Sequence, residues 1–516
     1  MIAFALVNGP LPKAGVIVLA ALTAGVLLAR TERARALAMI GLLILAPVLL
    51  LADVWNSPRL HVLHHHPLEA ALAGVAGLGL IVVLAVVIAR RRWLLAPLVV
   101  LALPFRIPIT LGGTTSNLLV PLYVVLAAAT LADVASVFRR SRESGASDES
   151  VATTASPAAT AAVWLGRLLA AYVVLYAVQA AYSLDFQLAL QQVVFFYAPF
   201  ALAFCLLSRV DWSPRLVRTC LVVVAGLAIA FTLVAFVEYA TRSVFLNPKL
   251  IATNADHTYF AANSIFYDSN IFGRFLALAM VLLAVTLLYD GDRREQIAAT
   301  LVLALLWVGL VVSLSRSSLG ALLAGLVASA AVRWRVSRAV VAIVGVVAVG
   351  AAALAISPHT FGLEQGFNGV FSGRGSLVSG GVRMFGQRPV WGWGSGSFQT
   401  EYHRQNPTSP GGVDTSHTLP VTIAAEQGVI GELVYLGLLV AAAVMLLYGA
   451  RGDPVRAAVA AAFVGLVVHT LVYDDFLSDP ATWALLGIGA ALARAPARQS
   501  VKRSPAGVPA PAAAAG

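Results

Sequence analysis

Charge and cysteine are both scarce in this chain. Only 11% of its 516 residues are charged, whereas 59% are hydrophobic, and its mean hydropathy is +0.86. A water-soluble protein of this composition would not have enough polar residues to cover its exterior. Its two cysteines, Cys205 and Cys220, provide no disulfide framework. The composition therefore excludes a soluble globular domain and a disulfide-rich secreted scaffold.

Two kinds of sequence pattern are also missing. The apolar residues form continuous runs and do not alternate with polar ones, which excludes a transmembrane β-barrel. We find no internal repeat and no pair of broken helices of the kind that marks inverted-repeat transporters. The pattern that remains is a series of continuous apolar helices.

The apolar runs have the length of membrane-spanning helices. Each approaches the roughly 20 residues that cross a hydrocarbon core of about 30 Å. Examples are 69–89, 216–237, 297–312 and 428–448. Two further runs, 93–105 and 481–494, are short for a crossing. We therefore predict an all-α polytopic membrane protein with about 12–15 transmembrane helices and a large ordered extracytoplasmic loop.

Basic residues predict the orientation of these helices. Clusters of arginine recur at every second loop, for example at Arg90–Arg92 and at Arg333 and Arg335. Because cytoplasmic loops carry the excess of Lys and Arg, we place these loops in the cytoplasm, the N-terminus outside and the C-terminus inside. Topology then explains the net charge of +11, which gives no reason to expect a nucleic-acid partner.

Composition divides the chain into six segments. Two of them, 139–160 and 495–516, are rich in small, polar or Pro residues and are predicted to be disordered on the cytoplasmic side, because they cannot build a core. Residues 357–427 are predicted to form the large extracytoplasmic loop, ordered by its own aromatic residues. Transmembrane spans fill the remaining segments, which are 1–138, 161–356 and 428–494.

Five arginines break the positive-inside pattern. They lie at the predicted outer face of the second half of the chain, where charges at membrane depth are costly unless paired. They are Arg274, Arg316, Arg374, Arg383 and Arg388. Acidic residues of the outer face could neutralise any one of them, but five arginines around one surface favour a binding site for phosphate. One Arg fork suits a phosphate group, and two suit a diphosphate.

His417 follows this arginine-rich loop, just before the span that closes it. A lone loop histidine is usually an ordinary residue, but a titratable base beside a phosphate-binding surface fits glycosyl transfer. Glu426 and Glu432 lie on the same stretch and could orient His417 or neutralise an arginine. We favour the second role for both glutamates.

The Gly-rich segment 392–398 invites comparison with a phosphate cradle. It does not precede a helix in a βαβ unit, so it predicts a tight turn of the loop and not a nucleotide site. A sugar that stacks on Trp391 or Trp393 is a weaker interpretation.

Metal ligands show no ordered spacing. The histidines of HVLHHHP lack accompanying cysteines or regularly placed carboxylates; they are His61, His64, His65 and His66. Asp53, Asp474 and Asp475 are candidates by residue type alone. We therefore predict neither a metal nor a cofactor.

The order of motifs over residues 265–440 resembles the O-antigen ligase and polymerase family of bacterial membrane proteins. A span ends in SLSR, a loop opens with Gly-Arg, the stretch RPVWGWGSGSF follows, and a His and E-x-G-x-x-G lead into the next span. The resemblance implies a multi-pass protein of the inner (plasma) membrane with an undecaprenyl-diphosphate-linked glycan as donor. It implies a glycan, lipid or protein as the acceptor.

Roles for individual residues also follow from the resemblance. Arg316 and Arg374 would hold the donor diphosphate, and His417 would activate the acceptor hydroxyl for an inverting transfer without a metal. Arg383 and Arg388 would be supporting contacts, although Arg388 stands where the family often has a His. Thr418 stands where the family commonly has an Asn, which leaves the details of acceptor binding open.

Three other functions remain to be compared with a ligase-like transferase, which we favour. A polymerase of lipid-linked repeats has the same motifs and a different acceptor. A transporter or flippase of lipid-linked sugars would also use arginines, but it needs polar residues along a path through the bilayer, and these spans are nearly all Ala, Val and Leu. A structural scaffold predicts that His417 and the outer arginines can be replaced without loss of function.

Overall fold

The computed structural model describes most of the chain as packed helices. The described residues are 9–54, 67–111, 114–143, 156–245, 254, 260–289, 292–334, 375–407 and 415–494. Within them, ten helices are long and apolar enough to cross a membrane, and two shorter apolar helices cover Arg92–Ala102 and Pro454–Thr470. The predicted all-α polytopic membrane protein is confirmed.

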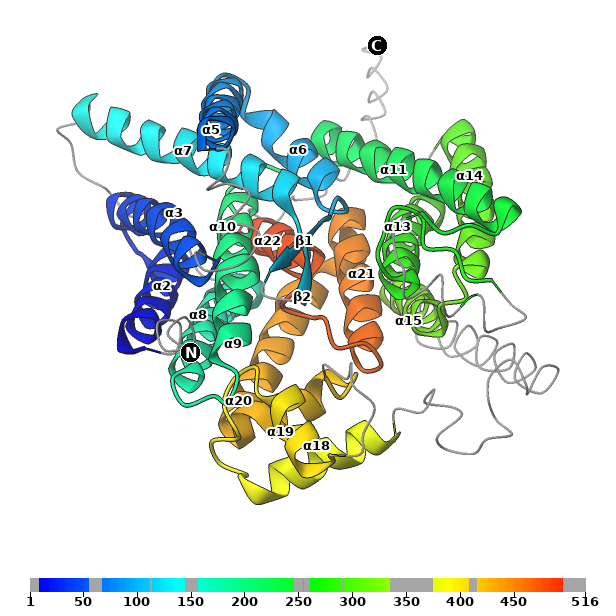
Figure 1. Ribbon diagram of the computed structural model, residues 1–516. Helices are drawn as coiled ribbons and strands as arrows, with labels where there is room; N and C mark the ends of the chain where they lie inside the picture. Colours follow the sequence, from blue (N-terminus) through cyan, green and yellow to red (C-terminus); the bar gives the residue numbers. More distant parts are fainter. Residues whose placement is uncertain are drawn as a thin grey trace, which may run out of the picture.

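The first part of the chain contributes helices to one side of the bundle (Figure 1). Its elements are α2 (Pro10–Leu28), α3 (Glu32–Val54), α5 (Pro67–Arg90), η1 (Arg92–Leu94), α6 (Leu95–Ala102), β1 (Ile107–Leu111), β2 (Thr114–Leu118) and α7 (Val120–Glu143). The strands β1 and β2 form an antiparallel hairpin in which Ile107 pairs with Leu118. The short apolar run at 93–105 therefore becomes an eight-residue helix that leads into a hairpin, and not a full crossing.

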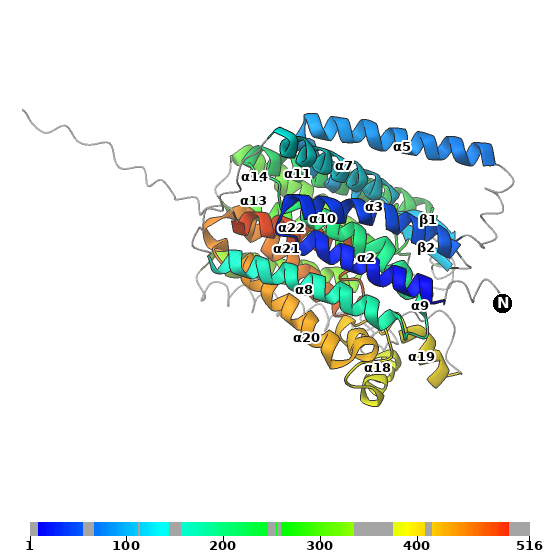
Figure 2. The same cartoon turned by 90° about the vertical axis from the view of Figure 1, so that its left-hand side faces the viewer.

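The second part of the chain forms the remaining helices. Up to residue 334 these are α8 (Pro157–Ala180), α9 (Phe186–Gln192), η2 (Val193–Tyr197), α10 (Ala198–Leu207), α11 (Pro214–Thr241), α13 (Ser269–Leu288), α14 (Arg293–Val312) and α15 (Arg316–Arg333). The C-terminal elements are α18 (Gly375–Gln387), α19 (Phe398–Gln405), α20 (Leu419–Leu447), η4 (Ala450–Gly452), α21 (Pro454–Thr470) and α22 (Pro480–Arg494). The axes of most long helices are roughly aligned with one another, as the side view shows (Figure 2).

Local sequence sets where several helices begin. Ser156, Ser213 and Asp453 each precede a proline, and each side chain accepts a hydrogen bond from a backbone N–H of the first turn. Such a cap satisfies a donor that the helix leaves unpaired, and proline at the first helical position already has the required φ. These three signals start α8, α11 and α21.

The core lies around α10, α20, α21 and α22. Trp483 and Tyr435 are fully buried there, and α22 buries most of its residues. Small residues allow close approach of helices: a Cβ on Gly465 would lie 2.7 Å from the carbonyl oxygen of Ala321, and one on Gly487 would lie 3.0 Å from that of Phe204. Backbone contact through small residues is the usual way in which membrane helices associate.

Apolar exposure at the periphery fits a lipid environment. In α5 only 11% of the spanning window is buried, and the large hydrophobic side chains that it exposes are Leu and Val. The helices before residue 139 pack into the same bundle, since α2 contacts α8 and α6 contacts α11. Of the segments predicted to be disordered, 139–160 and 495–516, residues 139–143 are helical in α7 and residues 157–160 are helical in α8, whereas 144–155 and 495–516 lie outside the described residues. Residues 357–374 and 408–414 of the predicted extracytoplasmic loop also lie outside them.

Candidate functional site

The Gly-rich segment docks onto a break in α20. Within that helix Gly428 has φ 67° and ψ −166°, which interrupts the helical backbone. The N–H groups of Trp393 and Gly394 donate to the carbonyl oxygens of Ala425 and Glu426 at 3.1 and 2.8 Å, and Val429 donates to Pro389 at 2.7 Å. Positive φ at Gly392, Gly394 and Gly396 gives the segment the tight turns that the sequence predicts.

Glu426 has a role that the sequence did not indicate. Its buried carboxylate accepts hydrogen bonds from the backbone N–H groups of Gly396 and Phe398, at 2.8 and 3.0 Å. It thereby joins α20 to the start of α19. Within the described part of the chain, Glu426 forms no ion pair with an arginine, and its carboxylate instead holds the Gly-rich segment through two backbone N–H groups.

His417 lies in a strained turn at the start of α20. Its φ of 57° is left-handed, a conformation that costs a non-glycine residue free energy and that clusters at functional sites. Neighbouring hydroxyls hold this turn in place. Ser416 Oγ donates to the carbonyl oxygen of Thr418 at 2.8 Å and lies 2.8 Å from Thr422 Oγ1, while the N–H of His417 donates to Thr415 Oγ1 at 3.3 Å.

Asp474 lies against the same turn. Its carboxylate is hydrogen-bonded by the side chains of Thr415 and Thr422, and its buried Oδ2 has no further partner. Desolvation of the carboxylate by burial raises the pKa of Asp474 to about 6. The turn that carries His417 is therefore attached to the loop of residues 471–479, which joins α21 to α22.

The same loop holds Arg274. Its guanidinium lies 2.7 Å from Asp475 Oδ2 and 2.7 Å from Asp479 Oδ2, and its side chain is only 3% exposed. Arg106, at the entry to β1, adds a second positive charge near both carboxylates. Desolvation by burial acts to raise the pKa of Asp475, but the attraction of Arg274 and Arg106 and the hydrogen bonds from Ser478 and Arg274 together outweigh it, so this pKa is lowered. Two carboxylates already satisfy Arg274, so the structure gives it the partners of a structural residue.

Arg316 begins α15 at the same end of the bundle. The preceding Leu314 has a left-handed φ of 53°, and Ser315 caps the helix. Asn270 Oδ1 accepts hydrogen bonds from Ser315 Oγ and Ser317 Oγ at 2.9 and 3.2 Å. Arg316 is exposed at the start of the helix, where the helix dipole favours anions.

The loop of residues 471–479 and the end of α21 link the two predicted motifs. His469 Nε2 lies 3.2 Å from Ser317 Oγ beside Arg316, and Tyr473 donates a hydrogen bond to Asp268 at 3.1 Å. Asp474 contacts the hydroxyls beside His417, as described above. One short segment thus borders both the arginine end of α15 and the histidine turn.

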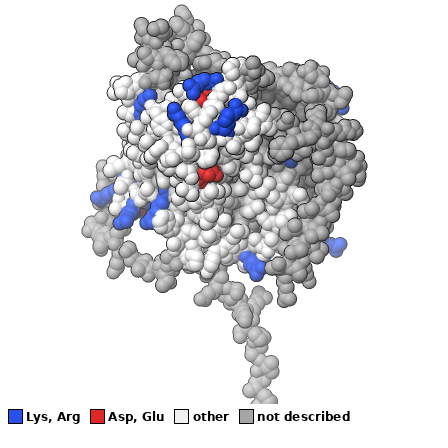
Figure 3. Space-filling view, turned by 90° about the horizontal axis from the view of Figure 1, so that it is seen from below, with Lys and Arg blue, Asp and Glu red and all other residues white. Residues whose placement is uncertain are grey.

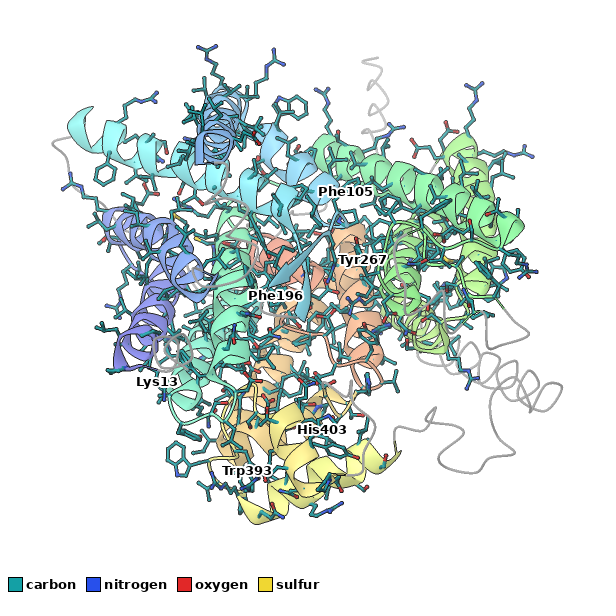
Figure 4. The ribbon with its side chains drawn as sticks, viewed as in Figure 1. Lys13, Phe105, Phe196, Tyr267, Trp393 and His403 are labelled. Atoms are coloured by element: carbon teal, nitrogen blue, oxygen red, sulfur yellow. The ribbon has the colours of Figure 1, made fainter. Side chains whose placement is uncertain are left out.

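Arg383 and Arg388 lie on a different surface. With Gln387, Trp393, Arg404 and Gln405 they line a hollow of about 570 Å³ on the outer sides of α18 and α19. Figure 3 views the side of the molecule on which these helices lie in Figure 1, and basic side chains lie on it in separate groups, one near the top of the view and one at its left. Trp393 is labelled in the lower part of Figure 4, together with His403 of α19. Arg316 is not among the residues that line this hollow.

The remaining predictions fall partly outside the described residues. Arg374 and the four histidines of HVLHHHP lie outside them. Within the described part of the chain, no group of three or more His, Cys, Asp or Glu side chains could hold a metal ion. Of the two tryptophans considered for sugar stacking, Trp393 is 8% exposed with Arg388 4.0 Å from its ring centre, whereas Trp391 is 57% exposed and keeps the more accessible ring.

Sequence reasoning missed several residues at this end of the bundle. The sequence suggests Asp474 and Asp475 as metal ligands by residue type alone, and it gives no signal for Asn270, His469 or Arg106. One signal for this site is the cluster of acidic and hydroxyl side chains in VYDDFLSD. It lies between two apolar runs, in a loop on the predicted extracytoplasmic side.

Comparison with known protein families gives one match. Residues 299–436 match the family model described as O-Antigen ligase. The resemblance inferred from the motifs is confirmed over this range, which contains Arg316, Arg374 and His417. No curated protein matches the chain. The match and the apolar helices together support a multi-pass inner-membrane enzyme of ligase or glycosyltransferase type that processes glycans.

Proposed function

We propose, taking the O-antigen ligase match over residues 299–436 as the premise, that the protein transfers a glycan from an undecaprenyl-diphosphate-linked donor to an acceptor hydroxyl. The transfer takes place on the extracytoplasmic face, with the N-terminus outside and the C-terminus in the cytoplasm. One observation carries the proposal: the segment from His469 to Asp479 borders both the Arg316 end of α15 and the His417 turn.

Arg316 and Arg374 bind the donor diphosphate in this proposal. An Arg fork matches phosphate oxygens, and the start of α15 adds the positive end of a helix dipole beside Arg316. As the bond to the sugar breaks, negative charge grows on the departing diphosphate. Fixed guanidinium groups that stabilise this charge supply the main catalytic effect.

His417 is the base that receives the proton of the acceptor hydroxyl. The acceptor oxygen attacks the anomeric carbon from the face opposite the diphosphate, so the new bond forms with inversion while the bond to the diphosphate oxygen breaks. Positioned bases of this kind accelerate a reaction by about 10²–10⁴. The left-handed φ of His417 and the hydroxyls around its turn support a position held for chemistry.

The other predicted arginines receive separate roles. Arg274 positions the loop of residues 471–479 through Asp475 and Asp479, because its guanidinium is already paired. Arg383 and Arg388 contact the substrate away from the reacting atoms. Neither a metal nor a cofactor takes part in the proposed step.

The alternative within the same family is a polymerase that extends lipid-linked repeats. The test is the size profile of envelope glycans and lipid-linked precursors in a deletion strain complemented with wild type or His417→Ala. We expect His417→Ala to behave like the deletion at normal membrane levels of the protein. Accumulated full-length lipid-linked chains then identify a ligase, and accumulated single repeats identify a polymerase. A wild-type profile with His417→Ala refutes the transferase and favours a flippase or a scaffold.

A further inference from the structure

The hollow on α18 and α19 is a basic surface with unpaired arginines. Among the described residues, neither Arg383 nor Arg388 forms an ion pair with a carboxylate. The third arginine, Arg404, holds Glu401 through two hydrogen bonds of 2.8 and 2.9 Å, which neutralises that carboxylate. The guanidinium groups of Arg383 and Arg388 are thus available to bind an anion of a ligand.

The ring of Trp393 holds the guanidinium groups of Arg388 and Arg404 in place. The guanidinium carbon of Arg388 lies 4.0 Å from the centre of its ring, and that of Arg404 lies 5.3 Å away. The ring itself is held by a hydrogen bond of 3.0 Å from its Nε1 to the carbonyl oxygen of Met384. An arginine that already rests on an aromatic face loses less conformational entropy when it binds an anion.

Two amide side chains complete the hollow beside the arginines. Gln405 Nε2 donates to Gln387 Oε1 at 2.6 Å, and Gln387 Nε2 lies 3.3 Å from Gln405 Oε1. Gln405 Nε2 also donates to Glu401 Oε1 at 2.6 Å, which uses both of its N–H groups. A side-chain amide has two N–H donors and a carbonyl with two lone pairs, so Gln387 keeps one N–H, and each carbonyl keeps one lone pair, for hydroxyl groups. Arginine forks next to amides match a sugar that carries an acidic group better than an inorganic anion or a bare headgroup.

The hollow is separated from the proposed reaction centre by one helix. The opposite face of α18 packs on the first turn of α20, where a Cβ on Gly381 would lie 2.5 Å from Val421 Cγ1, four residues after His417. A helix with its side chains is roughly 10–12 Å across. A group bound in the hollow is therefore remote from the transferred bond, on the same face of the protein.

We propose that this hollow, lined by Arg383, Arg388, Arg404, Trp393, Gln387 and Gln405, binds an acidic sugar, with a carboxylate or phosphate, of the glycan that the enzyme transfers or extends. The assignment rests on the proposed function for its biological role. A contact made equally in the ground state and in the transition state lowers KM without a change in kcat, and we expect a site remote from the transferred bond to act in this way.

The test is direct binding to the full-length protein in nanodiscs of phosphatidylcholine, measured by titration calorimetry. The probes are trigalacturonate and the neutral galactotriose. We expect trigalacturonate to bind about tenfold or more tightly than the neutral sugar, and Arg383→Gln/Arg388→Gln to remove this preference, because each lost charged hydrogen bond costs about that factor. Equal affinities for the two sugars, or an unchanged preference in the double variant, would overturn the proposal.

A matched control removes the same charge elsewhere. Arg90→Gln/Arg91→Gln, at the exposed end of α5, should leave trigalacturonate binding unchanged. A second comparison uses nanodiscs with phosphatidylglycerol. If the Arg383/Arg388 variant loses attraction to that lipid while wild type shows no preference for the acidic sugar, the surface holds lipid headgroups and the glycan site is refuted.

Two further measurements separate this proposal from the proposed function. His417→Ala should bind trigalacturonate as wild type does, because His417 is not part of the hollow. In the transfer reaction, Arg383→Gln/Arg388→Gln should raise the KM of the substrate that bears the acidic sugar and leave kcat near the wild-type value. A raised KM for the donor or for the acceptor identifies the source of the acidic sugar, whereas a lowered kcat with unchanged KM would contradict a remote binding site.

Discussion

Gly392 lies against the backbone of Glu426, and Gly428 lies against the backbone of Val390, where the Gly-rich segment meets α20. Both have a φ of 67°; a Cβ on Gly392 would lie 2.2 Å from the carbonyl oxygen of Glu426, and a Cβ on Gly428 would lie 2.3 Å from that of Val390. No other residue type fits either position without displacement of the main chain. The loop and the helix break are therefore one structural unit.

Substitution of either glycine should destabilise the contact between the Gly-rich segment and α20. We expect Gly428→Ala to lower stability by about 1–3 kcal/mol or more, because a strained φ and a backbone clash add together. Thermal unfolding of the purified protein in detergent measures the effect as a lower Tm. Gly386→Ala is the matched control: a Cβ there meets no atom within 4 Å, so Tm should stay equal or rise slightly. A Tm equal to that of wild type in Gly428→Ala would contradict the packing described here.

Loss of the His417 side chain should abolish transfer without loss of the fold. We expect His417→Ala and His417→Gly each to lower the rate of glycan transfer by about 10²–10⁴. The Gly variant should also unfold at a Tm at least as high as that of the Ala variant, because glycine tolerates the left-handed φ. His403→Ala on α19 is the control and should keep near wild-type activity. Equal losses in His403→Ala would show that the assay reports general damage.

Separate replacement of Arg274 and of Arg316 should distinguish an arginine that stabilises the fold from one that binds the substrate. Arg274→Ala leaves two buried carboxylates without their partner, which typically costs about 3–5 kcal/mol. Arg316→Ala changes an exposed residue, so the cost should stay within about 0.5 kcal/mol while transfer is lost. Unfolding in detergent and a transfer assay on both variants make the comparison. A stable Arg274→Ala protein with no activity would instead return Arg274 to the substrate site.

The buried carboxylate of Asp474 should make stability depend on pH. Its pKa rises from 3.8 in the unfolded chain to about 6 in the folded protein, because burial disfavours the charged form. The folded state therefore binds more protons between these values, and this residue's contribution to stability falls as pH rises from about 4 to about 6. Asp474→Asn should reduce that slope in Tm measurements at pH 4, 5, 6 and 7. An identical slope in variant and wild type would exclude Asp474 as its source.

We expect Arg374 to bind the diphosphate through two N–H groups of its guanidinium at once, and not through its positive charge alone. Arg374→Lys should lower transfer nearly as much as Arg374→Ala, because an ammonium group cannot make the bidentate contact with a phosphate. Initial rates at saturating acceptor, with membrane levels checked by immunoblot, measure this. Full activity in the Lys variant would count against a bidentate contact to the diphosphate.

Much of the helical framework was predictable because apolar runs report directly on spanning helices. The order of SLSR, Gly-Arg and the histidine motif also located the part of the chain that matches the ligase family. These signals are local, so a single sequence is enough to find them. The hairpin β1–β2 was missed because an apolar run that continues into Ile, Thr and Leu has no feature that separates a short span from a strand.

The ion pairs could not be predicted for a different reason. Arg274 and Asp475 lie 201 residues apart in the chain, and no local pattern pairs them. The sequence makes Arg274 a phosphate-binding candidate only because of its position near the predicted outer face. Its acidic partners, Asp475 and Asp479, lie next to it only in the folded protein, where α13 packs beside the loop after α21. The Glu426 contact with Gly396 has the same origin: backbone acceptors and donors carry no sequence signature.

The burial of α22 has a consequence for biogenesis. This helix lies against α10, α20 and α21, and Trp483 is among its fully buried side chains. The ribosome makes it after every other helix described, so the earlier helices must remain open to admit it from the translocon. Asp474, Asp475 and Asp479 precede it in the loop that it anchors. A nascent chain stalled before α22 should therefore insert into the membrane as an inactive intermediate that quality-control proteases can recognise.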